Sequence, residues 1–284
     1  MNIKFHCSEK SNFPNENQKM QAFLYKDYSI ESHNHDFYEI NIVMHGTAVH
    51  NIEDNAFGVQ TGDIFVIPPM TVHSYYNTQN LDVFHILLKK EFISSNMKEA
   101  MNVDGFIQLF EIEPYLRCHF EDKMFLHYSR SQLNSLQTDL NIIDENTKYD
   151  FNFPEILKEH TAWKIIYMFA GALYEHINSS KKIKSHKYEQ SIIFILEYMH
   201  KNYSEKITLD TLCKKTYLSR STLLRNFYDI CGCMPIEYLN NYRCNCAIEM
   251  IENHPDLSKT QIAHNCGFYD LSHMNRMLKT NQKF

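Results

Sequence analysis

The sequence predicts a two-domain α+β protein: a small β-barrel or jelly roll with a helical segment after it, followed by an all-helical domain. Short segments of alternating polarity fill residues 23–89, whereas helical periodicity begins at Ser129. The last hundred residues contain the same small helical unit twice. Charge divides the chain too, since residues 1–180 carry 13 Lys+Arg against 24 Asp+Glu and residues 181–284 carry 15 against 10. An acidic first part and a basic second part favour a polyanion-binding domain at the C-terminal end.

The barrel is predicted from short strands separated by turn residues. The segments 39–44, 48–52, 63–67 and 83–88 are apolar or alternating, and the residues between them include Gly46, Gly58, Gly62 and the pair Pro68–Pro69. Several short strands at this spacing are typical of a barrel or a jelly roll. We assign this domain to residues 1–128.

Residues 129–179 are predicted to form a helical segment. Apolar side chains recur at steps of three and four in 129–144, and a second helix runs from Pro154 to about Asn178. These helices either cover the barrel or pair with a second subunit, and we expect them to mediate dimerisation. The polar stretch 180–187 is the predicted linker.

The C-terminal domain, residues 188–284, contains two predicted helix-turn-helix units. Each has a short helix, a tight turn and a second helix, spanning 207–227 in the first copy and 258–278 in the second. Suitable N-cap residues precede these helices: Thr208, Ser219, Ser258 with Gln261 as a capping box, and Asp270. This arrangement is typical of proteins that place a helix in the major groove of DNA, and two copies suggest two successive grooves.

Helical spacing separates the inward and outward faces of the two recognition helices. Leu223, Phe227, Met274 and Leu278 are expected to face inward. The outward residues are the candidate DNA contacts: Arg220, Ser221, Leu224 and Arg225 in the first helix, and Leu271, Ser272, Asn275 and Arg276 in the second. Arginine can bond guanine bidentately and asparagine can bond adenine. Contacts to phosphate, or plain solvation, remain alternatives for these side chains.

The C-terminal domain resembles the AraC/XylS family of transcription regulators over about residues 188–283. The matching positions are Gly232, Pro235, Tyr238, Leu239, Arg243, Ala247, Ile262, Ala263, Gly267, Phe268, Arg276 and Lys279. Cys213, Met274 and Leu278 depart from the usual alanine and aromatic residues of the family. Members of this family continue into one more helix, so the end of this sequence at Phe284 implies that the final helix is missing.

The N-terminal domain contains two segments that resemble the cupin motifs. His33, His35 and Glu39 are followed by Gly46, and a second segment runs from Gly62 through Pro68 to His73 and Asn77, with Met70 where glycine is common. In metal-binding cupins, the matching residues His33, His35, Glu39 and His73 would be the ligands of an ion such as Fe(II), Mn, Ni, Cu or Zn. Residues two apart on a strand point the same way, so His33 and His35 can reach one centre.

The same residues also fit a pocket for an organic effector. Sensor domains of AraC-type regulators resemble cupins and often keep the histidines without a metal, so the resemblance implies a small metabolite such as a sugar. The candidate effector-binding residues are His33, His35, Tyr38, Glu39, His73 and Tyr75. We therefore expect no cofactor, with a divalent metal or a plain scaffold as the open alternatives.

Cysteine usage and the N-terminus favour a reducing compartment. The N-terminus has no apolar region of the secretory type, and the apolar stretch from Trp163 to Leu173 is too short to span a bilayer. We expect the eight cysteines to be reduced and the protein to be cytoplasmic without membrane contact. The pairs Cys231/Cys233 and Cys244/Cys246 do not have the usual zinc spacing and are interpreted as packing residues.

Taken as a whole, the sequence predicts a ligand-responsive, sequence-specific transcription regulator rather than an enzyme. Its expected partners are double-stranded promoter DNA, a small-molecule effector, a second copy of the chain and RNA polymerase. One alternative is a metal-dependent cupin enzyme with an appended DNA-binding domain, supported by the histidine and glutamate set. Another is a regulator that no longer binds DNA and acts by pairing with other subunits.

Overall fold

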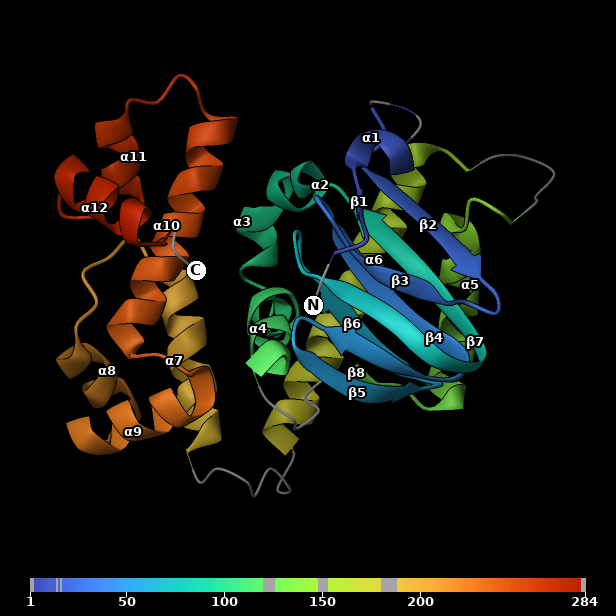
Figure 1. The fold of residues 1–284 in the computed structure, drawn as a ribbon, viewed down its shortest axis with the longest axis horizontal. Helices are drawn as coiled ribbons and strands as arrows, with labels where there is room; N and C mark the ends of the chain where they lie inside the picture. The colour runs from blue at the N-terminus through green and yellow to red at the C-terminus, as the bar shows by residue number, and fades with distance from the viewer. Residues whose placement is uncertain are drawn as a thin grey trace. The chain divides into compact units, whose positions relative to one another are not determined.

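The computed structural model describes residues 3–13, 15, 17–119, 126–147, 153–179 and 188–281. The chain divides into two compact units, residues 1–180 and 181–284 (Figure 1). The first unit combines a sheet with helices, and the secondary-structure elements described in the second unit are all helices. The predicted α+β class is therefore confirmed, while the predicted linker 180–187 lies outside the described residues.

The first unit is built on an eight-stranded sheet with the order β1-β3-β7-β4-β6-β8, in which β2 also pairs with β7 and β5 pairs with β4. Two long strands form its centre, and they pair from Tyr38 opposite Leu88 to Ile52 opposite His73. The segments 39–44 and 48–52, expected as separate strands, belong to one of them. The bounds are β1 Phe5–Cys7, β2 Met20–Tyr25, β3 Ile30–His35, β4 Tyr38–Ile52, β5 Asn55–Gln60, β6 Asp63–Ile67, β7 His73–Leu88 and β8 Leu126–His127.

Gly46 interrupts the long β4 strand where its register with β7 shifts. Its φ of 82° is in the left-handed region, and a Cβ added there would lie 2.2 Å from the carbonyl oxygen of Asn80. Only glycine fits such a close approach of two backbones. The bulge lets the register of β4 and β7 shift without ending their pairing.

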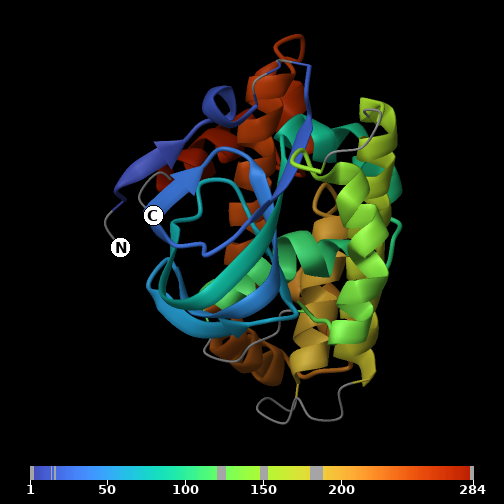
Figure 2. The same cartoon turned by 90° about the vertical axis from the view of Figure 1, so that its right-hand side faces the viewer.

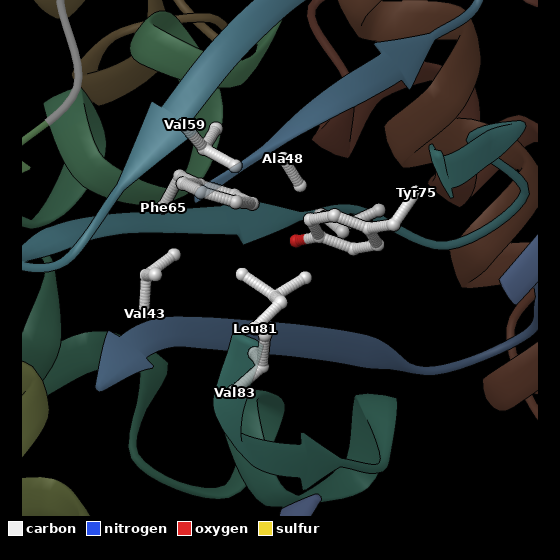
Figure 3. Packing of buried hydrophobic residues seen from close by; sticks show 8 residues of the cluster. Val43, Ala48, Val59, Phe65, Tyr75, Leu81 and Val83 are labelled. Atoms are coloured by element: carbon white, nitrogen blue, oxygen red, sulfur yellow. The ribbon is translucent and has the colours of Figure 1, made fainter. Parts of the chain in front are cut away.

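An apolar cluster lies inside the barrel (Figure 3). It is formed by inward-facing side chains of β4, β5, β6 and β7, namely Val43, Ala48, Val59, Phe65, Ile67, Tyr75, Leu81 and Val83. All eight are at most 5% exposed. Burial of this much aliphatic and aromatic surface supplies the main stabilisation of the barrel.

Helices cover one face of this sheet, with α5 and α6 lying side by side behind it in Figure 1 and to its right in Figure 2. Ser129 caps α5 with a capping box to Gln132. The apolar faces of both helices are buried, and so they cover the barrel, as one of the two sequence-based alternatives proposed. The bounds are α1 Glu9–Asn12, α2 Lys90–Ser95, α3 Met97–Ala100, the π-helix η1 Gln108–Ile112, α4 Glu113–His119, α5 Arg130–Ile143 and α6 Glu155–Ser179.

The second unit contains two helix-turn-helix pairs joined by a long helix, α10. The bounds are α7 Glu189–Lys201, α8 Leu209–Thr216, α9 Arg220–Cys231, α10 Pro235–Asn253, α11 Lys259–Asn265 and α12 Leu271–Asn281. The predicted caps are confirmed: Thr208, Ser219 and Ser258 accept from the backbone N–H three residues later, and Asp270 accepts from that of His273. Among the described helices, none has the length and apolar character needed to cross a membrane.

Arg243 on α10 ties the second unit together from inside. Its Nε donates to the carbonyl of Tyr203 and its Nη2 to that of Glu205, both at 2.7 Å. Gly267, in the turn before α12, packs against the carbonyl of Tyr203 and the guanidinium of Arg243. A Cβ added to it would lie 2.5 Å from the Tyr203 carbonyl oxygen and 2.9 Å from Nη2 of Arg243. The arginine and the glycine of the family pattern thus hold α10, the segment that follows α7 and the second turn together.

Candidate functional site

A buried carboxylate on β4, that of Glu39, is surrounded by imidazoles. Oε2 of Glu39 is 3.0 Å from Nε2 of His35 and 3.5 Å from Nε2 of His73. Its other oxygen, Oε1, lies 2.5 Å from Nδ1 of His85. All four side chains are at most 5% exposed.

Strand pairing brings these residues together. β7 pairs with β3 on one side and β4 on the other, so that His73 lies opposite His33 and His85 opposite Asn41. Glu39 stands two residues before Asn41 on the same face of β4. Residues separated by up to 50 positions in sequence therefore converge on one point inside the barrel.

The surroundings of Glu39 favour its ionised form. Burial alone would raise its pKa, but the hydrogen bonds from His35 and His85, together with the charge on nearby imidazoles, hold the pKa well below its usual range. For His73, burial disfavours the charged form of the imidazole and holds its pKa well below the ordinary value. The site thus combines an anionic carboxylate with a neutral imidazole at neutral pH.

His33 occupies a separate position beside this cluster. Its Nδ1 lies 2.9 Å from the carbonyl oxygen of Glu31, and its ring stacks on Phe5 at 5.0 Å. The His33 ring is also 4.2 Å from the ring of His73. Because β1 pairs with β3 in parallel, Phe5 covers His33 from the edge of the sheet.

A cavity of about 460 Å³ opens beside the cluster. Its polar lining includes His33, His35, Glu39 and His85, and its aromatic lining includes Phe23, Tyr25, Tyr28 and Phe37. Tyr25 and Tyr28 stack at 5.5 Å, and Tyr28 meets the ring of His85 edge-on at 4.6 Å. Hydrogen-bonding groups therefore face the same space as aromatic rings.

The structure brings four of the six predicted effector-binding residues into or beside this cavity. His33, His35 and Glu39 line it, and His73 lies directly behind Glu39. Tyr38 is not brought there, since it packs against Phe110 at 5.7 Å. Tyr75 accepts a hydrogen bond from Asn41 inside the apolar cluster instead (Figure 3).

Several lining residues were missed by the sequence interpretation, and His85 and Tyr28 are two of them. His85 stands in the apolar segment 83–88, where a lone histidine at an inward position was the available signal. Tyr28 gives no such signal, because it lies between β2 and β3 outside any periodic segment.

The candidate DNA-contacting residues lie on α9 and α12. Of these, Arg220, Ser221, Arg225, Ser272, Asn275 and Arg276 are exposed, and Leu224 is half-buried. Arg225 and Arg276 are each the sixth residue of their helix, so the two helices offer an arginine at the same place. Leu271 is half-buried and packs against the core of the second unit, which departs from its expected outward position.

Two families match separate parts of this chain. The AraC-like ligand binding domain matches residues 21–134, which contain the cluster and its cavity. A helix-turn-helix domain matches residues 212–281, which contain both recognition helices. The two matches therefore fall on the two structural units.

Curated relatives match most of the chain. The transcriptional activator RhaS of Enterobacter sp. (strain 638) is 24% identical over 254 residues, covering 87% of this chain and 82% of its own length. RhaS of Escherichia coli O157:H7 is 22% identical with the same coverage. Among solved structures, ToxT of Vibrio cholerae O395 matches with a TM-score of 0.37 and 13% identity, covering 92% of this chain and 93% of that one.

These relatives are transcription regulators, which favours the regulator over the cupin enzyme considered above. The ligand-binding and helix-turn-helix matches together account for both units. With an AraC-like ligand binding domain in its first unit and a helix-turn-helix domain in its second, the chain is a ligand-responsive, DNA-binding transcription regulator of the AraC type.

Proposed function

We propose that the cavity beside Glu39 binds a small polar metabolite such as a sugar. The observation that carries this proposal is the composition of the cavity, in which imidazole and carboxylate groups face stacked tyrosine rings. Carboxylates and imidazoles hydrogen-bond hydroxyl groups, and aromatic rings pack against the apolar face of a sugar. The volume of about 460 Å³ is within the range of small-molecule sites.

Tyr25 provides the test of this proposal, because it lines the cavity while its side chain is 52% exposed, so its loss should leave the barrel folded. Tyr76 on β7 is the matched control, since it is 40% exposed and is absent from the cavity lining. A panel of monosaccharides and their acids is screened by isothermal titration. We expect a ligand whose affinity falls at least 10-fold in Tyr25→Ala and is unchanged in Tyr76→Ala. Equal affinity in both variants would place the effector site elsewhere.

We propose that α9 and α12 enter successive major grooves of promoter DNA. The proposed contacts are the six exposed residues of these helices, with Leu224 beside them and Leu271 acting mainly in packing. Arginine at the sixth position of both helices supports a similar docking of the two units. An effector that binds two conformations of the protein unequally would then change the affinity for DNA.

Dimerisation through α6 is also a proposal, with a second copy of this chain as the partner. Met168 is 38% exposed on the outer side of this helix, and Ile156 is 65% exposed at its beginning. Burial of such side chains between two copies would be favourable. Light scattering should give the mass of a dimer for the wild type and of a monomer for Met168→Glu. A dimer that persists in this variant would exclude that face.

We also propose that the protein acts in the cytoplasm and influences RNA polymerase at the promoter it binds. This proposal follows from the regulatory function of the family and needs no further site. Transcription from the chain's own upstream DNA with purified RNA polymerase should change when the protein is added. Unchanged transcript levels at saturating protein would contradict a direct influence.

A further inference from the structure

The atoms around Glu39 are arranged as if around a positive ion, and His35 makes this clearest. Nδ1 of His35 lies 2.7 Å from the carbonyl oxygen of Phe37, which only accepts, so this nitrogen carries a proton. Nε2, the other nitrogen of this ring, lies 3.0 Å from Oε2 of Glu39, a separation that either a shared proton or a cation between the two atoms accounts for.

His73 adds a third ligand atom to the same place. Its Nε2 is 3.5 Å from Oε2 of Glu39, and neither ring nitrogen has a hydrogen-bond partner within the part of the chain that the structure describes. Ligand atoms of His35, Glu39 and His73 all lie within 4.8 Å of one another. Two ligands at about 2.1 Å from one ion are separated by about 3.0–3.5 Å for bond angles of about 90–110°. The two measured separations agree with this geometry.

We propose that Oε2 of Glu39 and the Nε2 atoms of His35 and His73 bind a divalent first-row transition-metal ion. Two imidazoles and one carboxylate form a ligand set that such ions prefer. This set differs from the one that the cupin resemblance implies, because His33 lies outside the group and stacks on Phe5.

The neighbours of these ligands hold them in position. His85 binds the second oxygen, Oε1, at 2.5 Å and so turns Oε2 toward the two imidazoles. The carbonyl of Phe37 fixes the orientation of the His35 ring. Hydrogen bonds of this kind to the outer atoms of metal ligands are typical of metal sites. Because Glu39 and His35 also line the cavity, an ion held there would border it.

The metal content of the full chain tests this inference. Protein purified without an affinity tag or chelator is analysed by inductively coupled plasma mass spectrometry, before and after dialysis against a chelator. We expect about one transition-metal ion per chain, its loss on chelation with a lower Tm, and recovery of that Tm with Zn²⁺. Chelated protein should also take up Co²⁺ with the visible absorption of a nitrogen- and oxygen-ligated ion.

Variants then identify the ligands. Glu39→Gln and His73→Ala should lose at least 90% of the metal, whereas His33→Ala and the control His45→Ala, an exposed histidine on β4, should retain it. Metal loss in His33→Ala would overturn the proposed set in favour of the cupin set. If wild-type protein neither contains an ion nor gains Tm with Zn²⁺ or Co²⁺, a proton occupies this place and the inference is wrong. These measurements use neither DNA nor effector, so they stand or fall separately from the proposed function.

Discussion

The two units use their polar side chains in opposite ways. In the first, Glu39 and its imidazoles are sequestered inside a barrel, where three strands bring them together. In the second, Arg225 and Arg276 stand on exposed helix faces. A ligand-sensing site depends on the whole tertiary structure, whereas a DNA-contacting face depends on the periodicity of one helix. Substitutions should therefore affect stability in the first unit and affinity in the second.

Removal of the central carboxylate should have the largest effect. Glu39→Ala removes the buried carboxylate that is bonded to His85 and lies beside His35 and His73, and breaking a buried pair in this way costs about 3–5 kcal/mol. Trp163, the single tryptophan, is in α6 and reports the unfolding of the first unit in denaturant. A loss below about 1 kcal/mol relative to His45→Ala would show that the cluster adds little to stability.

Arg243 tests whether the burial of a side chain, rather than the unit in which it lies, decides if its removal lowers stability. This arginine is only 7% exposed in the second unit, and its removal leaves the carbonyls of Tyr203 and Glu205 without their donors. Arg243→Ala should cost about 2–4 kcal/mol of unfolding free energy. Helical circular dichroism during denaturation measures this, with Arg225→Ala as the exposed control. Equal stability of the two variants would remove the distinction between interior and surface arginines.

Removal of the exposed arginines should lower the affinity for DNA and leave stability nearly unchanged. Arg225→Ala and Arg276→Ala should each weaken specific DNA binding by about 1–3 kcal/mol, or about 5- to 150-fold, if the side chain reads a base. Stability should stay within about 0.5 kcal/mol of wild type. Lys201→Ala on α7, which removes an exposed charge that belongs to neither recognition helix, is the control. Unchanged affinity and sequence preference in both arginine variants would reject these contacts.

A gradual pH effect is expected from His200, which is buried in the second unit and bonds the hydroxyl of Tyr238 at 2.8 Å. Burial lowers its pKa to about 3, from an ordinary value of 6.5. Below about pH 6.5 the unfolded chain binds a proton that the folded chain excludes. This residue therefore lowers stability by about 1.4 kcal/mol per pH unit on acidification, until the pH reaches the folded pKa. Ring NMR signals of His200 that titrate near pH 6.5 in the folded protein would contradict this.

Sequence interpretation succeeded for features that depend on neighbouring residues and failed for features that depend on tertiary structure. Thr208, Ser219, Ser258 and Asp270 were identified as caps because capping depends on three or four consecutive residues. His85 could not be assigned to the site from sequence, because its approach to Glu39 depends on the pairing of β7 with β4. Tyr38 illustrates a rule that sequence does contain. Neighbours on a strand point to opposite faces, so a residue next to Glu39 cannot share its cavity.

The helices between Lys90 and His119 were not expected, since they are short and without the periodicity of an amphipathic helix. Leu271 shows a related limit. It begins α12 and packs against the core of the second unit, a contact that depends on the tilt of the helix rather than on its spacing. Contacts that depend on the placement of whole helices or strands therefore could not be predicted from the sequence, whereas helix faces and N-caps could be.

DNA binding by the 284-residue chain tests the central claim most directly. Fluorescence anisotropy is measured on its own upstream DNA and on scrambled DNA of equal length, at two salt concentrations. Our account predicts at least 100-fold preference for the upstream sequence, with affinity for both DNAs falling as salt rises. Weak binding of equal strength to both sequences would contradict a sequence-specific regulator.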